Sequence, residues 1–373
     1  MTASDPQIQP YQSARNDFRS DTFTTPTQSM IQAALTASIG DSVYNEDVDT
    51  IALENKVAKL AGKPAGLYCV SGTLSNQIAI RTHLFQPPYS ILCDYRAHVY
   101  THEAAGLAML SNAMVTPVRP ANGDYLTLED IKQNIVPEDG DIHGAPTKLI
   151  SLENTLHGII TPYQELLRIK QFCIENNYKL HCDGARIWNA SVEAQVPLDQ
   201  YGEIFDSISI CLSKSIGAPM GSVLVGEKPF IKKANHFKKQ CGGGVRQSGM
   251  MAKMASVAID ETLPLLKSSH DKAKKLGDFC IEQGIILESP VDTNFVFIDL
   301  KENHIKDDDL IKYGKIHNVQ LMGGRIAFHY QIDDEALENV KKAVHDAHQN
   351  AKKNPHFHDG PYKMYRSPTP VKY

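Results

Sequence analysis

Residues 148–183 read KLISLENTLHGIITPYQELLRIKQFCIENNYKLHCD and set the pattern for most of the chain. A short apolar run, KLISLE, is followed by the helical pattern ELLRIKQFCIENN and then by a second apolar run, YKLHCD. The same alternation extends from about residue 27 to 260. Because strands that alternate with helices form parallel βαβ units, the sequence predicts an α/β fold around a mostly parallel sheet flanked by helices.

A different pattern begins near residue 260. Residues 261–283 predict a helix, which leads to a predicted strand, TNFVFIDL, at 293–300 and later to a second helical stretch at 333–353. A chain of 373 residues is long enough for a large domain and a smaller one, since single cores stop growing near about 250–300 residues. We therefore expect an N-terminal arm (1–26), a large α/β domain (27–262) and a small C-terminal α+β domain with an irregular tail (263–373).

The composition is that of a globular protein and excludes several classes of partner. Hydrophobic residues make up 42% and charged residues 22%, and the net charge of -5 favours neither nucleic acid nor an anionic membrane surface. The seven cysteines are scattered and never form C-x-x-C, so neither a disulfide framework nor a metal site is expected. The start of the chain lacks the basic and apolar runs of a signal peptide. These features predict a cytoplasmic protein.

Polar residues follow two of the predicted strands, at the sheet edge where ligands bind in open α/β folds. Asp183 is the last residue of YKLHCD, Arg186 follows it after Gly-Ala, and Lys214 follows SISICLS. A carboxylate that keeps a pyridine nitrogen protonated and a lysine that forms a Schiff base are the two groups that pyridoxal phosphate most needs. A loop salt bridge and a surface lysine would give the same spacing. The residues alone leave both interpretations open.

Two further segments have the composition of ligand-binding loops. Residues 70–73, Val-Ser-Gly-Thr, join a strand to a helix, where backbone N–H groups and the helix dipole suit a phosphate, although Ser is also an ordinary helix cap. The glycine run at 242–244 would let a loop approach a ligand closely. A P-loop is disfavoured because Ile-Cys-Leu stands where its glycine belongs, and no G-x-G-x-x-G follows a strand.

Read together, these pieces resemble the L-threonine aldolase family, in its low-specificity, fungal-type form. The resemblance runs from Phe18 to His329 and rests on motifs that recur in family order: FRSDTFTTP, GDSVYNEDVDT, SGTLSN, SLENTLHG, HCDGARIWNA, CLSKSIGAPMGS and GGGVRQSG. It implies a fold-type I enzyme that uses pyridoxal 5'-phosphate to cleave L-threonine and related β-hydroxy-α-amino acids into glycine and an aldehyde. It also implies a homotetramer with active sites at dimer interfaces.

The resemblance assigns a role to each candidate that contacts the cofactor. Lys214 is implied as the Schiff-base lysine, Asp183 as the partner of the pyridine nitrogen and His98 as the residue that stacks on the ring. The remaining implied cofactor contacts are Ser71, Gly72, Thr73, Arg186 and Arg246.

The resemblance also assigns substrate contacts. Ser20, Arg186 and Arg325 match the groups that hold the substrate carboxylate. His143 matches a second active-site histidine near the substrate hydroxyl, and Tyr44 lies in a motif that approaches the site. With 15 histidines in the chain, the composition alone singles out neither His98 nor His143.

Overall fold

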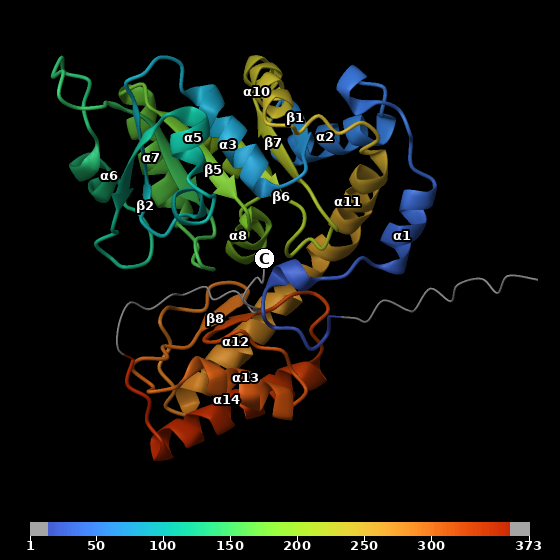
Figure 1. The fold of residues 1–373 in the computed structure, drawn as a ribbon, viewed down its shortest axis with the longest axis vertical. Coiled ribbons are helices and arrows are strands. Elements are labelled where there is room, and N and C mark those ends of the chain that lie inside the picture. Colours follow the sequence, from blue (N-terminus) through green and yellow to red (C-terminus); the bar gives the residue numbers. More distant parts are fainter. Residues whose placement is uncertain (1–13, 359–373) are drawn as a thin grey trace, which may run out of the picture.

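The computed structural model describes residues 14–358, which form two lobes (Figure 1). The large lobe holds a seven-stranded sheet in the order β1-β7-β6-β5-β4-β2-β3. Its strands are β1 (Ala65–Cys69), β2 (Ser90–Asp94), β3 (Met114–Val118), β4 (Thr147–Glu153), β5 (Lys179–Gly184), β6 (Ser207–Cys211) and β7 (Ser222–Gly226). All neighbours from β3 to β6 pair in parallel, and β7 runs antiparallel between β6 and β1. The predicted mostly parallel sheet is confirmed.

Helices flank this sheet in the pattern that the alternating sequence predicts. They are α1 (Gln28–Leu35), α2 (Val48–Leu60), α3 (Gly72–His83), α4 (His98–Thr101), α5 (Gly106–Ser111), α6 (Leu128–Asn134), α7 (Tyr163–Glu175), α8 (Ile187–Ala194), α9 (Leu198–Ile204), α10 (Lys228–Gln240) and α11 (Gly249–Thr262). Every residue of β2, β6 and β7 is buried, as expected for strands covered on both faces.

The small lobe combines a two-stranded antiparallel sheet with three helices. The strands are β8 (Phe295–Phe297) and β9 (Arg325–Ala327), and the helices are α12 (Leu266–Glu282), α13 (Asp307–Ile316) and α14 (Asp334–Lys353). Asp333 caps α14 by accepting a hydrogen bond from the Ala336 N–H, while Lys352 and Lys353 lie at its negative end. The buried face of α14 packs into a core separate from that of the large lobe.

The segment that precedes α1 belongs structurally to both lobes. Phe18 is fully buried in the small-lobe core and meets the ring of Phe328 edge-on at 5.2 Å between centroids. Residues 21–23 then form the short 3-10 helix η1 (Asp21–Phe23) between the lobes. Two further 3-10 turns are η2 (Ser42–Tyr44) and η3 (Leu263–Leu265). No helix within residues 14–358 is long and apolar enough to cross a membrane.

Candidate active site

The carboxyl ends of β1, β2, β4, β5 and β6 all lie at the sheet edge that faces the small lobe (Figure 1). The register places Glu153 of β4 beside Asp183 of β5, and Asp183 beside Ser209 of β6. Parallel pairing thus gathers the loops after these strands, and with them most of the predicted site residues, into one place.

Asp183 is held as a buried acceptor at the centre of this edge. Its side chain is 3% exposed. One oxygen accepts a hydrogen bond from Asn76 Nδ2 at 2.8 Å, and the other accepts one from the Ala185 N–H at 3.0 Å. Both bonds stabilise the charged carboxylate, which needs such partners when it is taken out of water.

His98 begins α4 and is fixed by two carboxylates. Its N–H donates to Glu153 at 2.9 Å, and its Nδ1 lies 2.9 Å from the buried carboxylate of Glu103. Burial by itself would lower the pKa of His98, but the hydrogen bond to Glu103, with the nearby charge of Asp183, raises it above the ordinary value. One ring nitrogen of His98 and one carboxylate oxygen each of Glu103 and Asp183 lie within 4.8 Å of one another. His98 therefore lies close to Asp183, as expected for a residue that stacks on a ring whose nitrogen Asp183 contacts.

Lys214 lies in the turn after β6. Its carbonyl accepts a hydrogen bond from the Gly217 N–H at 2.8 Å, which closes the turn, and one from Thr24 Oγ1 at 3.4 Å, which ties the turn to the N-terminal segment. The charge of Lys214 helps to lower the pKa of Asp21 and opposes the rise in the pKa of Glu153 that burial causes. Its amine is thus within electrostatic reach of Asp21 and of Glu153, which pairs with Asp183 in the sheet.

The first turn of α3 lies beside the Lys214 turn. Cys69, at the end of β1, and Cys211, at the end of β6, both pair with Ser222 of β7. Ser71 caps α3 by accepting a hydrogen bond from the Leu74 N–H at 3.1 Å. A Cβ placed on Gly72 would meet no atom within 4 Å, so there is open space before this helix end. The N–H groups of a helix's first turn favour an anion such as a phosphate.

Two arginines from different lobes converge on one aromatic ring. The guanidinium of Arg186 lies 4.5 Å from the centroid of Phe295, and that of Arg325 lies 5.5 Å from it. Arg186 also forms a bidentate ion pair with buried Asp21, through bonds of 2.8 and 2.6 Å. Arg325 donates to the carbonyl of Arg19 at 2.8 Å, next to Ser20. The paired guanidiniums form the cationic side of the site and suit a carboxylate.

Ser20 sits at the edge of this cationic side. It is 6% exposed, and its hydroxyl accepts a hydrogen bond from the Thr22 N–H at 3.3 Å to cap η1. Burial would raise the pKa of the neighbouring Asp21, but Arg186, Lys214 and Ser215 together hold it far below the ordinary carboxyl value. Asp21 therefore stays charged and fixes both Arg186 and the turn that carries Lys214.

The structure does not bring His143 to this cluster. The residue precedes β4, whereas the cluster lies beyond the carboxyl ends of the strands, so His143 falls at the opposite edge of the sheet. Its side chain is 88% exposed and its Nδ1 pairs with Asp141 at 2.7 Å. The implied role of His143 beside the substrate hydroxyl is therefore not supported within one chain.

His157, which sequence reasoning did not single out, lies in the loop after β4, within reach of the charges of Arg186 and Arg325. It follows β4 in the motif SLENTLHG, and its ring lies 5.8 Å from that of Phe297. Burial, with the charges of Arg96, Arg186 and Arg325, lowers the pKa of His157 to about 3. A histidine that comes after a parallel strand, rather than before it, was the signal that could have identified it.

Tyr44 and Arg246 form an exposed pair outside the cluster. The guanidinium of Arg246 lies 5.8 Å from the Tyr44 ring and 3.0 Å from a carboxylate oxygen of Asp41. Tyr44 is 72% exposed, and the Arg246 side chain is 48% exposed. The predicted contact of Arg246 with the cofactor is thus not formed by the chain's own site.

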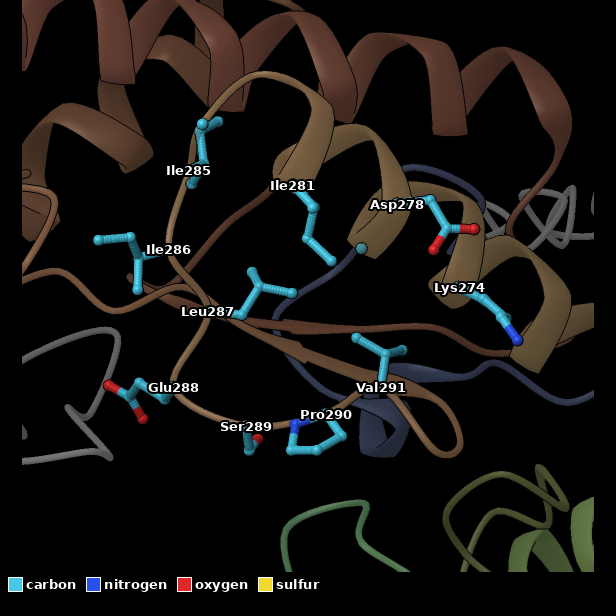
Figure 2. A pocket seen from close by; sticks show the side chains of 12 residues that line it. Lys274, Asp278, Ile281, Ile285, Ile286, Leu287, Glu288, Ser289, Pro290 and Val291 are labelled. Atoms are coloured by element: carbon cyan, nitrogen blue, oxygen red, sulfur yellow. The ribbon is translucent and has the colours of Figure 1, made fainter.

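A cavity of about 720 Å³ lies in the small lobe, away from these residues (Figure 2). It is lined by α12 and the segment that follows it, including Ile281, Ile286 and Val291. Its lining is largely aliphatic and contains none of the predicted site residues. We assign it no part in the chemistry.

The fold is that of a fold-type I enzyme. In such an enzyme a buried aspartate at a strand end, here Asp183, and a lysine after the next strand, here Lys214, lie at the same edge of the sheet. The chain belongs to the beta-eliminating lyase family, whose model matches residues 17–303. It is 68% identical over 358 residues to the low-specificity L-threonine aldolase of Eremothecium gossypii, covering 96% of this chain and 94% of the relative. It is 67% identical to the corresponding protein of Saccharomyces cerevisiae, covering 96% and 92%.

The fold is also that of a solved threonine aldolase from Leishmania major. The two structures share a TM-score of 0.73 at 21% identity, over 91% of this chain and 99% of the other. At this identity the likeness establishes the fold alone.

Proposed function

We propose that this chain is a pyridoxal-phosphate-dependent lyase that cleaves L-threonine and L-allo-threonine into glycine and acetaldehyde, and other β-hydroxy-α-amino acids into glycine and the corresponding aldehyde. The observation that carries the proposal is the identity of 68% over nearly the whole chain to a protein with this activity in its name. The enzyme would serve glycine formation and threonine catabolism.

The residues at the sheet edge fit the cofactor by their chemistry. Asp183 offers a carboxylate for the pyridine nitrogen, the open space at Gly72 lies at a helix end that favours phosphate, and Lys214 offers an amine. His98 supplies a flat ring beside Asp183. When bound, pyridoxal phosphate supplies an aldehyde that bonds amines and a ring that accepts the electron pair of the broken bond.

Arg186 and Arg325 bind the substrate carboxylate in this proposal. Asp21 neutralises part of the charge of Arg186 and fixes its guanidinium, while Arg325 is fixed by the carbonyl of Arg19. A carboxylate held from both lobes orients the substrate so that the bond between its Cα and Cβ can be aligned for cleavage.

Cleavage requires that a group on the protein, or a water that it holds, accepts the proton of the substrate's β-hydroxyl. His157 lies near both arginines and is neutral at neutral pH, since its pKa is lowered to about 3 by burial and by their charges. The low pKa makes it a weak base, which suits it to orient a water or the hydroxyl rather than hold the proton. His98, whose pKa is raised by Glu103, is the stronger base of the two.

Incubation with L-threonine and with L-allo-threonine tests the reaction. Acetaldehyde is followed by its reduction with an NADH-dependent alcohol dehydrogenase, and glycine is measured separately. Equal amounts of glycine and acetaldehyde are expected. β-Elimination, the reaction after which the family is named, would instead release ammonia and a 2-oxo acid from threonine and would contradict the proposal.

We further propose a cytoplasmic homotetramer in which active sites lie at dimer interfaces. The exposed pair of Tyr44 and Arg246 supports this assembly, because both residues were expected at a site and neither reaches the one in its own chain. Sedimentation of the purified protein tests the tetramer.

A further inference from the structure

A line of buried polar side chains runs between α3 and the sheet and ends at Asp183. Its members are at most 8% exposed: His83, Ser207, His181, Asn76 and Asp183. Asn76 and His83 lie seven residues apart on α3, so both face the sheet, and His181 lies two residues before Asp183 on the same face of β5. Helix and strand periodicity together therefore build a continuous polar line through an apolar layer.

Consecutive members of this line are within hydrogen-bond distance. His83 Nε2 lies 2.8 Å from Ser207 Oγ, and Ser207 Oγ lies 2.8 Å from His181 Nδ1. His181 Nε2 lies 3.2 Å from Asn76 Oδ1, and Asn76 Nδ2 lies 2.8 Å from Asp183 Oδ2.

The chemistry of the groups fixes the direction of each bond, beginning at the carboxylates. Asn76 Nδ2 donates one hydrogen to Asp183 and the other to Glu103 at 3.0 Å, so Asn76 Oδ1 accepts from His181. His181 Nε2 must then carry a hydrogen.

The outer half of the line follows from the charge of His181. Burial, with the nearby ring of His83, lowers the pKa of His181 to about 3, so its ring is neutral and Nδ1 accepts a hydrogen bond from Ser207. The Ser207 oxygen in turn accepts from His83 Nε2–H. Every donor in the line points toward Asp183.

We propose that His181, backed by Ser207 and His83, is a positioning residue that locks the Asn76 amide with its NH₂ group toward Asp183. The lock holds Asp183 as the anion that pairs with the pyridine nitrogen, and this last step rests on the proposed function. Without it, the Asn76 amide could turn its oxygen toward Asp183 and Glu103 and repel both. The line is not a proton relay, because the Asn76 amide neither gains nor loses a proton at neutral pH.

The tautomers of the two histidines test the line directly in the full-length protein without cofactor. Nitrogen NMR of histidine-labelled protein should show His181 and His83 as neutral rings with the hydrogen on Nε2 at neutral pH. The signals are assigned by comparison with His181→Gln and His83→Gln. A charged His181, or a hydrogen on its Nδ1, would overturn the proposal.

Two substitutions at His181 separate positioning from packing. His181→Gln keeps an amide N–H for Asn76, whereas His181→Leu fills the space without a donor. We expect His181→Leu to weaken pyridoxal-phosphate binding and to lower kcat by about tenfold each, with KM for threonine unchanged, and His181→Gln to restore most of both. Equal losses in both variants, or a rise in KM alone, would contradict the lock.

Ser207→Ala and His270→Leu complete the comparison. Ser207→Ala removes the hydroxyl that donates to His181 Nδ1 and changes the side-chain volume little. It therefore keeps the proposal testable if His181→Leu does not fold. It should raise the population of the other His181 tautomer and weaken cofactor binding several-fold, and an unchanged tautomer and affinity would overturn the proposal. His270, 2% exposed and bonded to Asn189 and Glu193, is the matched buried histidine whose replacement should lower stability but not cofactor affinity.

Failure of the lock and failure of the proposed function give different results. If the tautomers and cofactor affinities are as expected but threonine yields no glycine, the lock stands and the proposed reaction falls. If threonine is cleaved but His181 has the other tautomer, the reaction stands and the lock falls.

Discussion

Lys214 offers an amine in a turn that is closed by the Gly217 N–H and held to the N-terminal segment by Thr24. We expect Lys214→Ala to fold normally, because the bonds that hold the turn use the backbone carbonyl rather than the side chain. The variant should lack the visible absorbance of covalently held cofactor, and borohydride should fix no label in it. Turnover of threonine like that of the unmodified protein, with the absorbance retained, would contradict the assignment.

Asp183→Asn keeps the size of the side chain but removes its charge and replaces one of the two acceptor oxygens by an NH₂ group. The variant should still bind pyridoxal phosphate but lose at least about a hundredfold in kcat, or ~2.7 kcal/mol of barrier, because an amide cannot keep the pyridine nitrogen protonated. The measurement is the rate of acetaldehyde release, divided by the cofactor occupancy read from absorbance. A near-normal rate at full occupancy would rule out this role.

At the scale of elements, the register of β4 and β5 places two carboxylates side by side. Burial, together with the charge of Asp183, raises the pKa of Glu153 from its ordinary 4.5 to about 7. Because the folded pKa is the higher one, the folded state is favoured while Glu153 is protonated and loses this advantage as the pH rises through about 7.

Glu153→Gln should therefore change stability in a pH-dependent way. The amide still offers an oxygen to the His98 N–H, so we expect little effect near about pH 4.5 and a gain of about 1–3 kcal/mol in the free energy of unfolding near about pH 8. Urea unfolding of the cofactor-free protein at both pH values measures this difference. Equal destabilisation at both would show that packing, not charge, dominates at this position.

The alternation of apolar and helical runs was sufficient to predict the α/β sheet, which is confirmed, and to locate Asp183 and Lys214 at strand ends. It could not identify β7 as antiparallel, because a buried strand has the same composition in either direction. Family resemblance carried His143 into the site by motif alone. Its position before β4 keeps it away from the strand ends of its own chain, so its role beside the substrate hydroxyl stays a prediction.

The line from His83 to Asp183 was readable in principle from the spacing of its residues. A separation of seven on a helix and of two on a strand each place polar side chains on one face. The sequence did not show that α3 packs against β5 and β6, because this contact is set by tertiary packing. Glu103 is a similar case, since it lies near Asp183 through contacts with Asn76 and Gln77 rather than through any motif.

At the scale of the whole molecule, the two lobes share a polar junction next to the site. Asp21 accepts hydrogen bonds from Arg186 of the large lobe at 2.8 Å and from Asn294 of the small lobe at 3.3 Å. Thr293 of the small lobe also donates to the carbonyl of Gly158, just after β4, at 2.7 Å. Arg325 on β9 is 9% exposed at this junction, so a carboxylate bound by Arg325 and Arg186 would be held by both lobes.

Arg325→Lys keeps the positive charge but loses the planar fork that meets a carboxylate with two hydrogen bonds. We expect threonine kcat/KM to fall by roughly ten- to a hundredfold, as for the loss of a charge-assisted bond of about 1.5–3 kcal/mol, while the cofactor absorbance stays intact. The control ligand is an amino alcohol without the carboxylate. Its weak binding should hardly change, because it lacks the group that Arg325 binds. If threonine cleavage is unaffected, or if both ligands weaken equally, Arg325 is not the carboxylate anchor and the small lobe does not bind substrate.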